Sequence, residues 1–271
     1  WRLMPVVGAF DVLTGMAVLF APRAGVLLYM SLWAIWTALL RPLSGDSLFE
    51  FIERAGNYGV PFALLLLTVL PVVALRWLDP WSSAFMLDAR IDAWRAGTKD
   101  YQTQYRWVPL EKIAPTTALA VIAAEDQQFP FHAGFDFQSI RKAIRANNNS
   151  KQLRGASTIS QQVAKNLFLW SGRSYFRKGL EAYFTRLIEW LWPKERSLEV
   201  YLNIAEFGHG VYGVEAAAQR YFRKPATKLN GPESATLAAV LPNPRTFKVQ
   251  NPSRYVLKRR RWIQQQMRAL G

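Results

Sequence analysis

Long apolar segments dominate the first 80 residues of the chain. Residues 55–75 carry no charge and have a strongly apolar centre. About 20 such residues are enough to cross the hydrocarbon core of a bilayer, so a transmembrane helix is predicted here, with a buried core helix as the alternative. Residues 24–40 are also uncharged and close to spanning length, while residues 3–20 are apolar but interrupted by Asp11. The pattern predicts two membrane helices and offers a candidate for a third.

The arginines that flank these segments indicate an orientation. Placing Arg2, Arg41 and Arg54 in the cytoplasm leaves Arg23 alone on a short outer loop. Positive charge is enriched in cytoplasmic loops, so this arrangement is favoured. It puts residues 81–271 outside the cytoplasm.

After residue 80 the apolar positions recur at helical spacing, and no run alternates strictly over six or more residues. This pattern predicts helices rather than strands. Asp136, Ser157 and Ser174 are suitable N-caps, and Pro232 suits a first helical turn. The expected helices cover residues 84–96, 115–126, 136–147, 157–169, 174–192, 195–206, 212–221, 231–240 and 252–269.

Charge is distributed unevenly along the chain. The formal net charge is +15, and residues 1–80 hold equal numbers of basic and acidic side chains, so the whole excess lies in residues 81–271. A basic domain suggests an anionic partner, and nucleic acid, anionic lipid and pyrophosphate all qualify. The chain has no cysteine and two histidines, which excludes disulfides and argues against a zinc site.

Two adjacent carboxylates, Glu125 and Asp126, end an apolar helix and precede a turn that runs through His132 to Gly134. The C-terminal end of a helix dipole and apolar surroundings both raise the pKa of a carboxyl group. A carboxylate of that kind suits general-base chemistry. The alternatives are a solvated acidic helix end and a structural, hydrogen-bonding role for His132.

The segment 155–166 is a glycine-containing loop that enters a polar helix. The backbone N–H groups at such a helix start suit an anion. Gln161 and Lys165 share one face of the helix, and Gln162 and Asn166 repeat that spacing beside them. The alternative is a solvated polar face.

The segment 173–181 places Arg177 and Lys178 on one helix face with Glu181. One interpretation is an ordinary salt bridge within the helix. The other is a carboxylate surrounded by cations that hold a phosphate leaving group.

The segment 194–208 is an amphipathic helix with Glu199, Asn203 and Glu206 beside its apolar stripe. Alone it carries no functional signal.

Taken in order, these four motifs resemble those of the peptidoglycan glycosyltransferases, glycosyltransferase family 51. The matching blocks are Glu125–Gly134, Gly155–Asn166, Arg173–Glu181 and Leu198–Asn203, within a resemblance over about residues 75–271. The segments after residue 212 look like the monofunctional branch. Since the chain stops at Gly271, no penicillin-binding transpeptidase domain is expected.

The resemblance implies an all-α, lysozyme-like, mostly helical glycosyltransferase domain preceded by transmembrane helices. Residues 1–54 are expected to be an additional membrane region of unknown role, residues 55–80 an anchor, and residues 81–271 the glycosyltransferase domain. Monofunctional members of the family usually have one membrane helix, so the first region is a departure.

The activity implied by the resemblance is polymerisation of lipid II into β-1,4-linked glycan, with inversion at the donor anomeric carbon and release of undecaprenyl pyrophosphate. Glu125 is the expected general base, and Glu181 the second catalytic carboxylate, which orients the site or holds a divalent cation such as Mg²⁺ or Mn²⁺. The residues expected to bind or support substrate are Asp126, Gln161, Lys165, Arg173, Arg177, Lys178 and Asn203.

The implied partners are lipid II, the growing glycan strand, the membrane and other cell-wall synthesis or division proteins, with no nucleic acid. The implied location is the bacterial inner membrane, with the catalytic domain on its periplasmic face. The alternative enzyme is a lysozyme-like muramidase or lytic transglycosylase that cleaves the same glycan, although cleavage of a neutral glycan needs no cation cluster. A membrane-tethered nucleic-acid-binding protein and a purely structural membrane protein are the alternatives outside enzymes.

Four phenylalanines precede a basic run in residues 141–145. An aromatic cluster with a basic fringe suits the headgroup region of a bilayer, and a buried aromatic cluster is the alternative. The four are Phe129, Phe131, Phe135 and Phe137.

Overall fold

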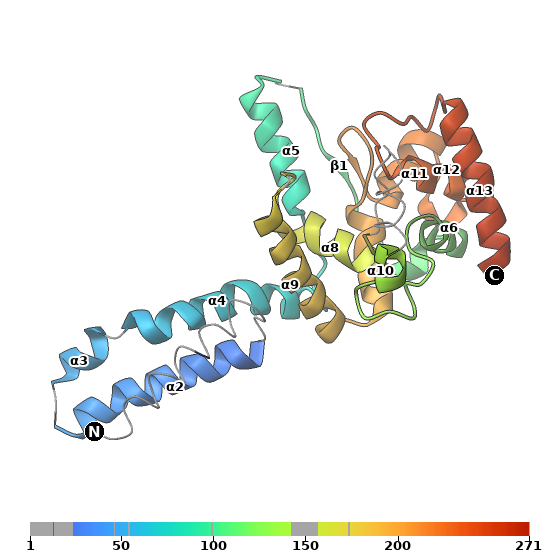
Figure 1. Ribbon diagram of the computed structural model, residues 1–271. Helices are drawn as coiled ribbons and strands as arrows, with labels where there is room; N and C mark the ends of the chain where they lie inside the picture. Colours follow the sequence, from blue (N-terminus) through green and yellow to red (C-terminus); the bar gives the residue numbers. More distant parts are fainter. Residues whose placement is uncertain are drawn as a thin grey trace. The chain divides into compact units, whose positions relative to one another are not determined.

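The chain forms two compact units. Figure 1 colours the chain from blue at the N-terminus to red at the C-terminus. The computed structural model describes residues 13, 24–45, 47–53, 55–98, 100–141, 157–172 and 174–270. The N-terminal unit spans Trp1–Trp77 and the C-terminal unit spans Leu78–Gly271.

The N-terminal unit contains helices α2 (Ala24–Leu43), α3 (Leu48–Glu53) and α4 (Ala55–Ala74), and α2 packs against α4. Helices are therefore present at two of the predicted spans, and the third, residues 3–20, lies outside the described residues except for one position. Within the part of the chain that the structure describes, no helix combines the length and apolarity needed to cross a membrane. The membrane-spanning character of these segments stays a prediction.

The C-terminal unit is mostly helical, as predicted. Of the predicted helix 136–147, the described part is helical over residues 137–141. Two 3-10 turns join the helices, η1 (Leu110–Lys112) and η2 (Ala226–Lys228). The helices are α5 (Ala84–Arg95), α6 (Pro115–Glu125), α8 (Ile159–Phe168), α9 (Tyr175–Leu191), α10 (Lys194–Ile204), α11 (Val214–Phe222), α12 (Gly231–Val240) and α13 (Arg254–Leu270).

Helix α12 lies at the centre of one half of this unit. Its residues from Ser234 to Val240 are all buried, and it packs against α6 and α13. This part of the helix therefore has no side that faces solvent, and the alanines of α12 allow close approach of its neighbours. The other half is built by α8, which packs against α9 and α10. The functional side chains come from both halves.

A small sheet of strands β1 (Gln104–Tyr105), β2 (Glu206–Gly208) and β3 (Val211–Tyr212) was not expected from the sequence. The strand order is β1-β3-β2, with β1 parallel and β2 antiparallel to β3. The predicted helices 195–206 and 212–221 each extend into this sheet, so these ends are corrected. Strands of two or three residues are too short to produce a recognisable alternation.

Candidate active site

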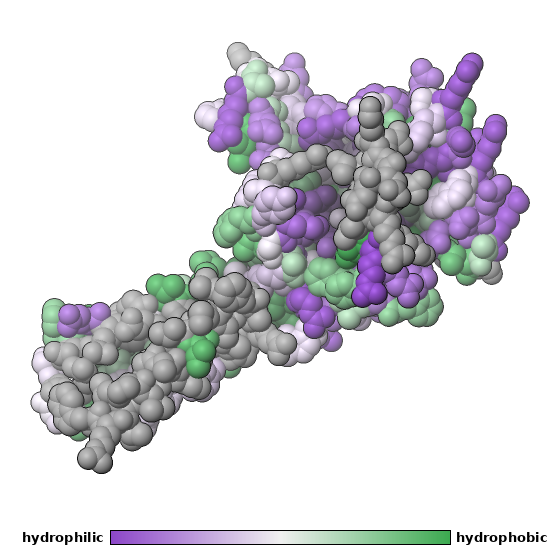
Figure 2. All heavy atoms as spheres, in the orientation of Figure 1, coloured by the Kyte–Doolittle hydropathy of each residue, from purple (hydrophilic) through white to green (hydrophobic). Residues whose placement is uncertain are grey.

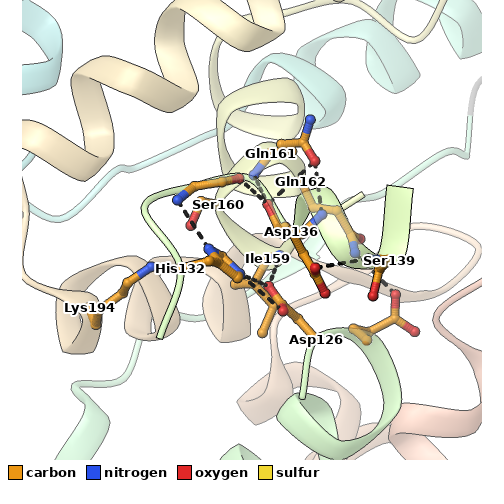
Figure 3. Close-up of polar contacts among 12 residues, drawn as sticks. Asp126, His132, Asp136, Ser139, Ile159, Ser160, Gln161, Gln162 and Lys194 are labelled. Atoms are coloured by element: carbon orange, nitrogen blue, oxygen red, sulfur yellow. Dashed lines mark hydrogen bonds and ion pairs between the residues drawn. The ribbon is translucent and has the colours of Figure 1, made fainter. Parts of the chain in front are cut away.

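The turn after α6 is organised around a buried histidine–aspartate pair (Figure 3). The Nε2 atom of His132 lies 2.9 and 3.1 Å from the two carboxylate oxygens of Asp126. The backbone N–H of Gly134 donates to Nδ1 of the same ring at 3.0 Å. Because Nδ1 accepts a hydrogen bond, the ring proton sits on Nε2 and is donated to Asp126. His132 therefore has a structural, hydrogen-bonding role, which was the alternative given for it above.

Asp126 also satisfies the start of α8. Its Oδ2 accepts a hydrogen bond from the N–H of Ile159 at 2.9 Å (Figure 3). Thr158 and Gln161 form a reciprocal capping box at the same helix end. The N-cap is thus Thr158 rather than the predicted Ser157, and the anion at this helix N-terminus is the side chain of Asp126.

Gly134 is required at its position for two reasons. Its φ of +90° lies in the left-handed region, which side chains other than glycine rarely adopt. A Cβ atom would also stand 2.8 Å from Cγ of Glu189 and 2.9 Å from Cγ2 of Thr185. The carbonyl of Gly134 in turn accepts a hydrogen bond of 2.7 Å from the hydroxyl of Thr158. The motif that ends in Gly134 therefore connects the end of α6 to the start of α8.

Glu125 itself is held by side chains from two other helices, α8 and α13. Its Oε2 accepts from Nε2 of Gln162 at 3.0 Å, and its Oε1 accepts from Nη2 of Arg259 at 3.2 Å. The hydroxyl of Tyr201 donates to Oε1 of Gln162 at 3.1 Å and so fixes which end of that amide faces Glu125. Arg259 also donates to the carbonyl of Ala124, one of the free carbonyls at the end of α6.

Burial raises the pKa of Glu125, whose side chain is 13% exposed. The hydrogen bond from Gln162 and the charges of Arg259 and Lys165 oppose that rise. The alternative of a solvated acidic helix end therefore does not apply to Glu125. The environment is the one that a general base requires, a carboxylate with a raised pKa that is still reached by cations.

A second carboxylate, Glu181, is almost fully buried beside a group of cations. Nη1 of Arg177 donates to its Oε2 at 3.0 Å, and Nζ of Lys178 donates to its Oε1. Burial lowers the pKa of Lys165, while the charges of Glu181 and Glu125 both raise it. The charges of both carboxylates therefore act on Lys165.

The salt bridge within α9 is present, and Lys178 bonds the same carboxylate. That these cations hold a phosphate leaving group stays a prediction. Arg177 is 9% exposed and directed at Glu181, whereas the Lys178 side chain is 49% exposed. Lys178 is the one of the pair that retains access to solvent. Arg173 lies outside the described residues.

Three of the residues expected to bind or support substrate make contacts within the protein, and their role toward substrate stays a prediction. Asp126 and Gln161 serve the turn and the capping box described above. Asn203 is fully buried, and its amide bonds both backbone groups of Val108 and the carbonyl of Glu199, at 2.8 to 3.0 Å. Each of the three side chains therefore bonds backbone groups of another segment or of its own helix start.

The described side chains offer few ligands for a divalent cation, and the expectation of one at Glu181 stays a prediction. Both carboxylate oxygens of Glu181 are already bonded to cationic groups. Among the described residues, no group of three or more His, Cys, Asp or Glu side chains is placed to hold a metal ion, whereas Mg²⁺ and Mn²⁺ prefer several oxygen ligands.

The contacts of Glu125 include residues that sequence reasoning missed. The polar stripe of α8 indicates Gln161, but its neighbour Gln162 is the glutamine that contacts the carboxylate. Arg259 belongs to a basic run on α13, a helix whose exposed face is part of the hydrophilic surface in Figure 2. Nothing in the local pattern distinguishes Arg259 from its exposed basic neighbours.

The four phenylalanines near the turn separate into two kinds. Phe129 is 2% exposed and belongs to the core, so it is not a membrane contact. Phe131 and Phe137 are 82% and 66% exposed, and Phe137 stacks on Phe135 at 6.0 Å. The aromatic cluster is therefore partly buried and partly open to solvent.

Comparison with known proteins identifies the family of the chain. The family described as Transglycosylase matches residues 93–268. A protein of Escherichia coli (strain ATCC 8739) named biosynthetic peptidoglycan transglycosylase is 55% identical over 83% of this chain and 93% of its own length. Proteins of the same name from Xylella fastidiosa (strain 9a5c) and Xanthomonas campestris pv. campestris (strain B100) are each 52% identical, over 78% and 79% of this chain and 87% of their own lengths. The chain therefore belongs to the transglycosylase family and is a glycosyltransferase enzyme.

Proposed function

We propose that this enzyme polymerises lipid II into β-1,4-linked peptidoglycan strands and releases undecaprenyl pyrophosphate. The relatives named biosynthetic peptidoglycan transglycosylase support a role in peptidoglycan synthesis. The observation that carries the detailed proposal is that the charges of both Glu125 and Glu181 act on Lys165. It joins a buried base to a group of cations, which are the two needs of this reaction.

Glu125 acts as the general base. It takes the proton from the 4-hydroxyl of the acceptor sugar as that oxygen attacks the anomeric carbon of the donor. The bond from this carbon to the pyrophosphate oxygen breaks on the opposite face, so the anomeric configuration is inverted. The raised pKa of Glu125 favours proton transfer from a weakly acidic hydroxyl.

The departing pyrophosphate carries away the electron pair of the broken bond and needs positive charge. Lys165 and Lys178 supply it, and Glu181 with Arg177 holds Lys178 in place. Arg173, which follows α8 in the sequence, completes this group in the proposal. Pyrophosphate is a good leaving group, so a protonating acid is less important than in glycoside hydrolysis.

The membrane is the proposed location, with the C-terminal unit on the periplasmic face of the inner membrane. The substrate is itself a membrane lipid, so the enzyme must meet it at the bilayer surface. Helices α2 and α4 expose large apolar side chains, which supports contact with an apolar environment. Among them are Leu28, Leu32, Trp36, Leu64, Leu67 and Leu70.

The experiment is incubation of the purified protein with lipid II, followed by lysozyme digestion of the product. Polymer that lysozyme degrades supports synthesis, whereas shortening of added glycan supports the muramidase alternative. Glu125→Gln is expected to lower the rate by about 10²–10⁴, as removal of a general base does, while lipid II binding is retained. A fully active Glu125→Gln enzyme contradicts the assignment of the base.

A further inference from the structure

Arg196, on α10, binds the first residues of the C-terminal unit. Its Nη2 donates to the carbonyl of Leu78 at 2.6 Å, and its Nη1 lies 3.0 Å from Oδ1 of Asp79. The same Nη1 lies 2.7 Å from Oε2 of Glu199, and the guanidinium lies over the ring of Trp107 at 5.1 Å. The Arg196 side chain is 9% exposed. A buried guanidinium thus makes several directional contacts at once, which a lysine in its place cannot reproduce.

A second contact holds the same segment. The hydroxyl of Tyr105 donates to the carbonyl of Pro80 at 2.5 Å, and Pro80 is buried. Burial and the charge of Asp79 raise the pKa of Tyr105 to about 12, so the phenol stays a donor at neutral pH. We call residues 78–80 the stem, because they follow directly on the N-terminal unit.

The helix that binds the stem also reaches the catalytic base. Glu199 accepts the N–H of Leu110 at 2.9 Å, one turn along α10 from Arg196. Farther along, the hydroxyl of Tyr201 holds Gln162, which in turn holds Glu125. One rigid helix of 11 residues therefore carries both the stem contact and a partner of the base network.

We propose that Arg196 is a positioning residue that fastens the stem to α10 and thereby sets the orientation of the Glu125 network relative to the segment that enters the domain. The inference rests on the proposed function, in which the substrate is a membrane lipid. In the proposed function the reacting sugar is tied to the bilayer by its lipid tail, and the stem is the segment that connects the catalytic unit to the N-terminal unit. A loosened stem then misplaces the base by small distances, to which reaction rates are sensitive.

The test compares polymerisation by the full chain in two settings, lipid II in liposomes that also hold the enzyme, and lipid II in detergent micelles. Arg196→Lys and Asp79→Ala are the variants. Lys224→Ala is the matched control, because it removes a partly exposed ion pair, Lys224–Glu233, elsewhere in the same unit. We expect both variants to lose about tenfold or more in liposomes and less than about threefold in micelles, where the geometry is free to adjust. The control should lose little in either setting.

An equal loss in the two settings shows a merely structural role and overturns the inference, as does an unchanged rate in liposomes. If Arg196→Lys does not fold, Asp79→Ala decides alone, because the Asp79 side chain is 53% exposed and its removal leaves no cavity. A wild-type enzyme that makes no polymer in either setting refutes the proposed function, and the inference falls with it. The two failures are therefore distinguishable.

Discussion

The guanidinium of Arg259 lies 3.2 Å from the carboxylate of Glu125, although 134 positions separate the two residues in the chain. The side chain of Arg259 is 22% exposed and that of Glu125 is 13% exposed. An ion pair this well shielded from solvent is screened less than a surface pair. Helix α13 thus contributes a charge that lowers the pKa of Glu125, the proposed base.

Removal of this charge should move the pH profile. Arg259→Gln is expected to raise the pKa of Glu125 further, because a charge that opposes the rise is lost. Glu125 must be ionised to act as a base, so the acid limb of the rate–pH profile should shift to higher pH. Rates measured across the acid range test this, with Arg261→Gln, an exposed neighbour on α13, as the control. An acid limb that stays in place in Arg259→Gln contradicts the coupling.

Glu125→Gln should stabilise the fold at neutral pH. The pKa of Glu125 is raised in the folded state, so the folded protein binds the proton more tightly than the unfolded chain. Its contribution to stability is present below the ordinary glutamate pKa and is lost as pH rises through the folded value. Glutamine avoids that loss, so its advantage in melting temperature should be largest at neutral pH and disappear in acid. A variant less stable than wild type at pH 7 would falsify this expectation.

Lys165 should define the alkaline limb of activity. Burial lowers its pKa from the usual 10.5, and the charges of Arg177 and Lys178 lower it further. The charges of Glu181 and Glu125 oppose this decrease. The cation is therefore lost at a lower pH than for an exposed lysine, and activity should fall with it. In Lys165→Arg the charge persists, so a variant that retains activity should show an alkaline limb displaced to higher pH. If the alkaline limb lies at the same pH in the wild type and in Lys165→Arg, the titrating group is not Lys165.

Gly134→Ala should be costly in stability. Its positive φ is shared by Gly97, but an added Cβ at Gly97 meets no atom within 4 Å. Gly97→Ala is therefore the matched control and should cost about 1 kcal/mol for the backbone conformation alone. Gly134→Ala should cost more, since Glu189 and Thr185 must also move. Chemical denaturation of both variants measures the difference, and equal losses would rule out the steric part.

Local sequence determined most of the helices and several of their ends. Ser174 caps α9 as predicted, and Pro232 lies in the first turn of α12, because caps and first turns depend on residues a few positions apart. The order of the four motifs was enough to indicate the family. The predicted N-cap Ser157 is wrong by one residue, because the neighbouring Thr158 has the same capping chemistry and only the path of the loop decides between the two hydroxyls.

Tertiary structure alone decided which groups surround the base. Arg259 approaches Glu125 because α13 and α6 both pack on α12, and that approach has no periodicity along the chain. The same holds for the short strand β1, which pairs with β3 more than 100 positions later. Contacts between distant segments depend on how buried faces fit together, whereas the sequence pattern reports only which face of each helix is buried.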